Sequence, residues 1–149
     1  MSCVLGFDVG SRLTGVAVGN LLTASARPLA TIPMREGSPD WPRLDALREA
    51  WRPDTLVVGL PLQLDGSEQA ASRTARRFAA ELRARYALPV AFMDERGSSR
   101  EAAQRFARAR AEGSRRRRDR TSLDADAAAI ILERWLHTAV AASAAPAAD

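Results

Sequence analysis

The hydrophobic pattern along the chain alternates between short apolar runs of strand length and longer stretches with helical periodicity. Five extended runs predict β-strands, at residues 3–9, 14–19, 28–33, 55–60 and 89–93. The short turn Gly10-Ser11-Arg12 links the first two, so these must pair antiparallel. The last two are separated by helical stretches, which predicts parallel pairing through right-handed crossovers.

The stretches between these runs carry helix start signals. Ser38-Pro39 predicts an N-cap followed by proline at the first helical position, and Ser67 predicts the cap of a long helix to about Tyr86. A capping box at 98–101 opens another helix, and a final helix spans about 123–140. The predicted fold is an α/β domain over residues 1–140. It contains a mixed five-stranded sheet, a three-strand antiparallel meander plus two parallel strands, with helices on both faces. The Ala-rich segment 141–149 is expected to be a disordered tail.

Composition narrows the chemistry that this domain can perform. The chain has 149 residues, 46% of them hydrophobic and 27% charged, which is typical of one globular domain. No apolar run reaches the roughly 18 residues of a membrane span, and the start is too polar for a secretory signal, so we expect a cytoplasmic protein. Cys3 and His137 are single, which excludes an internal disulfide and a Cys/His zinc site. Any active site must use carboxylates, hydroxyls and arginines.

Positive charge is concentrated in one third of the chain. All 22 basic residues are arginine, and residues 73–120 hold 15 of them against 6 acidic residues. This distribution indicates a surface that binds a polyanion. A codon bias toward arginine and alanine in a GC-rich genome is the plainer explanation of the arginine content and stays open here.

Three acidic residues occupy positions where strand ends and a helix start can meet. Asp8 ends the first strand, Glu95 follows the last strand, and Asp124 lies in the first turn of the final helix. Ligands of α/β sheets bind beyond such strand ends. Asp126 faces roughly the opposite way on the helix, so Asp124 is preferred. Alternatively, these acids are a turn residue, a solvated strand exit and a helix N-terminal charge.

Three converging carboxylates would need a hard cation between them. Oxygen ligands favour Mg²⁺ or Mn²⁺, and a pair of such ions promotes phosphodiester hydrolysis. Ser11 and Thr14 have no nearby histidine to serve as their base, so a hydroxyl nucleophile is not expected. The joint placement of the acids is compatible with a metal-dependent nuclease, and the structural alternative for each acid stays open at this point.

The order and spacing of four motifs resemble the YqgF family of bacterial proteins, described as pre-16S rRNA nucleases or Holliday junction resolvases. The segments that carry the resemblance are Gly6–Val18, Val58–Ser67, Asp94–Arg96 and Leu123–Leu132. It extends from about Cys3 to His137. The resemblance implies a ribonuclease H-like fold and a catalytic, metal-binding triad at Asp8, Glu95 and Asp124. It also implies processing of the 16S rRNA precursor near its 5′ end.

The expected partner is the ribosomal RNA precursor, or a structured DNA. The candidate phosphate-binding residues are Arg12, Arg96, Arg100, Arg115, Arg116, Arg117 and Arg118. No aromatic platform for base stacking is evident, so recognition of shape or of single strands is expected. The expected state is a monomer or a weak homodimer.

Three alternatives stay open at this point. A Holliday junction resolvase would need a two-fold dimer with two active sites. An actin-like ATPase would share the loop at Asp8–Gly15, but it would need a second domain to enclose its nucleotide. A non-catalytic RNA-binding or transcription factor would not depend on the acids.

Overall fold

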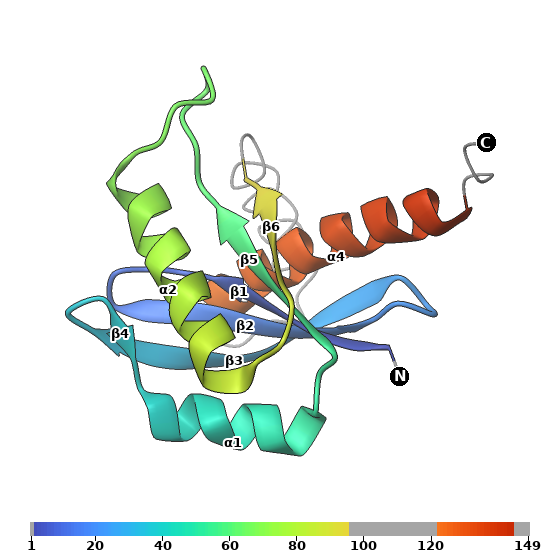
Figure 1. Ribbon diagram of the computed structural model, residues 1–149, viewed down its shortest axis with the longest axis horizontal. Helices are drawn as coiled ribbons and strands as arrows, with labels where there is room; N and C mark the ends of the chain where they lie inside the picture. The colour runs from blue at the N-terminus through green and yellow to red at the C-terminus, as the bar shows by residue number, and fades with distance from the viewer. Residues whose placement is uncertain (1, 96–121, 145–149) are drawn as a thin grey trace, which may run out of the picture.

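A six-stranded mixed sheet forms the centre of the protein, seen here in a computed structural model that describes residues 2–95 and 122–144 (Figure 1). The strands are β1 (Cys3–Asp8), β2 (Leu13–Asn20), β3 (Ser25–Arg35), β4 (Ser38–Pro39), β5 (Thr55–Leu60) and β6 (Val90–Asp94). The described helices are α1 (Trp41–Trp51), α2 (Ala70–Tyr86) and α4 (Ser122–Ala144). The spatial order of the strands is β4-β3-β2-β1-β5-β6.

Strand directions confirm the predicted mixed sheet. β1, β2, β3 and β4 pair antiparallel in sequence order, whereas β5 pairs parallel with both β1 and β6. The carboxyl ends of β1, β5 and β6 therefore meet at the same edge of the sheet. Because Asp8 ends β1 and Glu95 directly follows β6, this edge carries two of the predicted acids.

The predicted count of five strands was one too few, because Ser38 and Pro39 form a short strand instead of a helix cap. They pair with Arg35 and Met34 across a tight turn in which Gly37 has a φ of 81°. The helix begins after Asp40, whose side chain accepts a hydrogen bond from the Arg43 N–H at 3.3 Å.

The predicted cap of the second long helix was also misplaced. Ser67 instead donates its hydroxyl to Asp65 at 2.6 Å within the preceding loop. The helix starts three residues later, where the Gln69 N–H donates to the Ser72 hydroxyl at 3.0 Å. A serine three positions into this helix thus performs the capping that was expected of Ser67.

Different helices cover the two faces of the sheet. α1 and α2 cover one face, where Phe7 packs edge-to-face on Phe78 with ring centroids 5.4 Å apart. α4 covers the other face, where Val4, Leu132 and Leu136 are fully buried. The alternation along β1, with Val4 toward α4 and the next residue toward α1 and α2, is the period of a strand buried on both faces.

The final helix runs beyond its predicted end. α4 reaches Ala144, four residues into the predicted tail, because alanine is the strongest helix former. Residues 145–149, the predicted helix near residues 98–101 and the predicted loop at 113–120 lie outside the described residues. None of the helices described here is both long and apolar enough to cross a membrane.

Candidate active site

Asp8 and Glu95 come together above the end of β5, the strand between their own. The Glu95 N–H donates to the Leu60 carbonyl at 3.0 Å, which fixes the chain as it leaves β6. The Glu95 side chain then passes over Gly59, since a β-carbon there would lie only 2.5 Å from Glu95 Oε2. Ile131 of α4 contacts the same position, so Glu95 lies on the α4 face of the sheet.

The two carboxyl groups share a hydrogen bond and are largely buried. Burial, followed by the negative charge of Asp124, raises the pKa of Asp8 to about 6. Burial and the negative charge of Asp8 raise the pKa of Glu95 to about 8. A hydrogen bond between two carboxyl groups requires that one of them carries a proton, and burial of both groups favours this shared protonated state.

Asp124 lies in the first turn of α4, which packs directly on the backbone of β2. Gly15 pairs with Asp8 in the sheet register. A β-carbon on Gly15 would lie 2.9 Å from Ala125 N and within 2.5 Å of the carbonyl atoms of Asp124. Only glycine permits so close an approach. The structure therefore places the start of α4 opposite Asp8.

The negative charge of Asp124 acts on Asp8 and raises its pKa. Burial raises the pKa of the half-buried Asp124 carboxyl as well. All three acids thus share one physical property, a carboxyl group that is harder to ionise than usual. Titratable groups perturbed in this way cluster at functional sites.

The donor set fits a hard divalent cation. Among the residues that the structure describes, no three acidic, histidine or cysteine side chains are arranged as a ready-made metal site. The Asp8–Glu95 pair, however, is made of oxygen donors only, and it holds a proton where like charges would otherwise meet. A bound cation relieves the same repulsion when it displaces that proton.

Of the predicted phosphate-binding residues, Arg12 is the one within the described chain. It is exposed in the turn between β1 and β2, four residues after Asp8. Its carbonyl accepts a hydrogen bond from the Met34 N–H at 2.7 Å. The other predicted arginines lie outside the described residues: Arg96, Arg100, Arg115, Arg116, Arg117 and Arg118.

Sequence reasoning missed Gly15 and Gly59, the two residues that make room for the acids. The available signal was a glycine inside each of two apolar strand runs, which often marks a close approach by another element. The residue types that carry chemistry were evident from the sequence. The glycines that make room for the acids belong to other strands, so the spacing of the residues along the chain did not predict these contacts.

Comparison with known proteins identifies the family. The sequence profile of the family described as "RuvX: Holliday junction resolvase" matches residues 2–138. The chain belongs to the RuvX family. This confirms the resemblance to the YqgF family, which is the same group.

Relatives of high identity carry one name. A protein of Xanthomonas axonopodis pv. citri named "Putative pre-16S rRNA nuclease" is 61% identical over 133 residues, covering 89% of this RuvX chain and 86% of its own. A protein of Xanthomonas campestris pv. campestris with the same name matches with the same identity and coverage.

Solved structures confirm the ribonuclease H-like fold. Thermus thermophilus RuvC in complex with a Holliday junction substrate aligns with a TM-score of 0.54 at 18% identity, covering 93% of this chain and 96% of RuvC. The fowlpox virus Holliday junction resolvase aligns with a TM-score of 0.53 at 12% identity, covering 92% and 99%. At this identity the likeness concerns the fold of the RuvX chain alone.

Proposed function

We propose that this protein is a divalent-metal-dependent nuclease that hydrolyses phosphodiester bonds in RNA and processes the 5′ end of the 16S rRNA precursor. The observation that carries the proposal is the buried, hydrogen-bonded pair of Asp8 and Glu95 with Asp124 beside it. The family and the name of the Xanthomonas relatives support the reaction class and the substrate. The site of action would be the cytoplasm.

In this proposal the three acids hold the cation site, and each has a distinct part. Mg²⁺ or Mn²⁺, as two ions, would supply the Lewis acid and the activated water of phosphodiester hydrolysis. Asp8 would provide one carboxylate ligand from the end of β1. Glu95 would provide a second, and the proton of the Asp8–Glu95 hydrogen bond would pass to solvent when both carboxylates hold the ions. Asp124 completes the set from α4.

Arginines outside this acidic centre would neutralise the phosphates that flank the scissile bond. The exposure of Arg12 in the turn after β1 supports this role. We assign the same role to Arg96, Arg100 and the four arginines at 115–118, which follow or precede the acids in sequence. The active form would be a monomer or a weak homodimer.

A second candidate is cleavage of Holliday junctions in DNA, which the description of the matching family favours. Symmetric cleavage of two strands needs two active sites related by a two-fold axis. Sedimentation of the protein with and without a four-way DNA junction separates the two functions. A stable dimer that cuts the junction in paired strands would favour the resolvase.

The test is cleavage of a short single-stranded RNA in Mn²⁺ by the wild type, Asp8→Asn and a control. Asp54→Asn is the matched control, because Asp54 is exposed at the opposite end of the sheet, just before β5. Wild type and Asp54→Asn should cut, whereas Asp8→Asn should bind RNA without cutting it. Equal cutting by Asp8→Asn, or loss of RNA binding in that variant, would contradict the proposed division of roles.

A further inference from the structure

Four arginines from three contacting elements lie around the strand ends that carry the acids. Arg12 precedes β2, and the hydrogen bond from Met34 N to its carbonyl places it beside the end of β3, where Arg35 follows. Arg77 of α2 reaches the next turn, where its Nη1 atom lies 3.5 Å from the position of a β-carbon on Gly37. Arg73 lies one helical turn before Arg77. We refer to Arg12, Arg35, Arg73 and Arg77 as the arginine arc.

The first turn of α2, which carries Arg73, is hydrogen-bonded to the segment that follows β5. Ser72, the neighbour of Arg73, donates its hydroxyl to the carbonyl of Pro61. Pro61 directly follows Leu60, whose carbonyl accepts the hydrogen bond from Glu95. Arg12, at the other end of the arc, lies four residues beyond Asp8. The arc therefore lies at the edge of the sheet where β1 and β5 end, with Arg73 and Arg77 on the α2 face and Glu95 on the α4 face.

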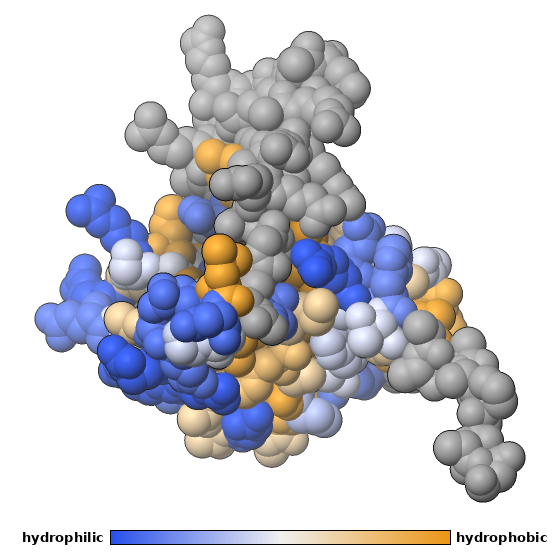
Figure 2. All heavy atoms as spheres, turned by 90° about the horizontal axis from the view of Figure 1, so that it is seen from above, coloured by the Kyte–Doolittle hydropathy of each residue, from blue (hydrophilic) through white to orange (hydrophobic). Residues whose placement is uncertain are grey.

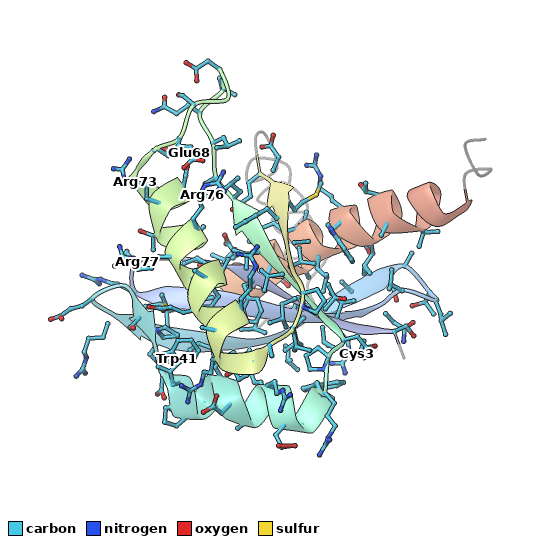
Figure 3. All side chains as sticks on the ribbon, viewed as in Figure 1. Cys3, Trp41, Glu68, Arg73, Arg76 and Arg77 are labelled. Carbon is cyan, nitrogen blue, oxygen red and sulfur yellow. The ribbon has the colours of Figure 1, made fainter. Side chains whose placement is uncertain are left out.

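The arginines of the arc form no ion pair among the described residues, although the charge of Arg73 helps to lower the pKa of the nearby Glu68. All four side chains are exposed, and no described carboxylate lies within ion-pair distance of them. Neighbouring arginines are different, because Arg76 pairs with Glu68 at 2.6 Å and Arg85 pairs with Asp45 at 2.6 Å. Figure 3 shows Glu68 beside Arg76, with Arg73 and Arg77 directed away from the sheet. Figure 2 shows hydrophilic side chains gathered over this side of the molecule.

We propose that the arginine arc binds the backbone of single-stranded RNA and guides the strand to Asp8 and Glu95. The inference rests on the nuclease function proposed above, and it adds Arg35, Arg73 and Arg77 to the substrate-binding set. A phosphate backbone needs repeated guanidinium donors, and residues one helical turn apart present them about 5–6 Å from each other. The arc contains no aromatic or aliphatic anchor of the kind found at the centre of protein interfaces.

The experiment measures binding separately from cleavage. In an Asp8→Asn background, a fluorescein-labelled single-stranded RNA of about 12 nucleotides is titrated between roughly 50 and 300 mM salt, a range over which phosphate contacts change affinity strongly. The arc variant is Arg73→Gln/Arg77→Gln. The charge-matched control is Arg27→Gln/Arg52→Gln, whose side chains are exposed at the far end of α1, with Arg27 stacked on Trp51. Arg73→Lys/Arg77→Lys tests rescue by charge.

The arc variant should flatten the dependence of log K on log salt by about 1.4, which is two phosphate contacts at about 0.7 each. The control should keep the parent slope, and the lysine variant should restore most of it. Three results would overturn the proposed role of the arc: the arc variant keeps the parent slope, the control loses as much slope as the arc variant, or the parent does not bind RNA at low salt. If the wild type cuts RNA while the arc variant keeps the parent slope, the nuclease proposal holds and the role of the arc is refuted.

Discussion

Replacing Gly15 with alanine should disable the site without touching any acidic residue. The new β-carbon would lie within 2.5 Å of both carbonyl atoms of Asp124, whereas ordinary contacts begin at 3.4 Å. The first turn of α4 must therefore retreat by about 1 Å or more, because the backbone of a sheet and of a helix cannot yield locally. A displacement of about 1 Å in a catalytic group costs up to about 10²-fold in rate. We expect a loss of that order in kcat/KM for RNA cleavage.

The control for this experiment lies on the same strand. A β-carbon on Gly19 would meet Leu136 Cδ1 at 2.8 Å and Leu132 Cδ2 at 3.0 Å, so Gly19→Ala also crowds the contact between β2 and α4. Both variants should lose about 1–3 kcal/mol of stability through overpacking. Gly19 lies four residues along the strand from Gly15, roughly 13 Å away. Two of its three nearest neighbours are side chains that can move, and the third is the Ser25 carbonyl at 3.0 Å.

The two variants separate loss of stability from displacement of the site. Cleavage is measured well below both melting temperatures, at saturating Mn²⁺, with thermal unfolding recorded in parallel. Gly19→Ala should retain activity within about threefold of wild type, a difference of less than 1 kcal/mol in the barrier. Equal activity of Gly15→Ala and wild type, or an equal loss in Gly19→Ala at similar stability, would refute the role given to the close approach.

Two further predictions concern stability. Asp8 and Glu95 have higher pKa values in the folded protein than in the unfolded chain, so the metal-free protein should lose stability as pH rises from about 4 to about 8. Asp8→Asn should remove up to about 3 kcal/mol of this loss of stability. Melting curves recorded from about pH 5 to 8.5 in the presence of a chelator test this prediction. A wild-type melting temperature that does not change with pH would contradict the raised pKa values of the pair. Phe78→Ala should lower the free energy of unfolding in urea by about 3–5 kcal/mol, because it leaves a cavity in the core beside Phe7. Leu22 is 86% exposed, so Leu22→Ala should lower it by less than about 0.5 kcal/mol. Similar losses in the two variants would contradict the placement of Phe78 in the core.

The sheet could be predicted from the sequence because each strand carries its own signal. The apolar runs ending at Asp8 and before Asp94 gave the strands of the site, and the short turn after Asp8 gave the antiparallel pair. Ser38 and Pro39 were misassigned because a serine followed by proline is compatible with both the start of a helix and an edge strand. That choice depends on pairing with Met34 and Arg35, a tertiary contact.

The sequence pattern was enough to select the acids of the candidate site, but not to predict the contacts that bring them together. Asp8, Glu95 and Asp124 stand at strand ends and at a helix start, which are positions that local pattern reveals. The packing of α4 on Gly15 and the passage of Glu95 over Gly59 depend on which strands are neighbours. The sequence also does not distinguish Arg73 from Arg76, because the Glu68 that pairs with Arg76 is found from side-chain geometry.

The separation of opposite charges is what connects this site to its proposed chemistry. No described arginine forms an ion pair with Asp8, although the chain is rich in arginine and the exposed Arg12 is only four residues away. An arginine on that carboxylate would lower its pKa and stabilise the fold, but it would also compete with any cation. Burial of Asp8 without a described arginine partner raises its pKa and destabilises the metal-free protein as pH rises. We infer that the Asp8 carboxyl is kept apart from the described arginines so that it can hold a cation, while the exposed arginines of the arc are directed to phosphates.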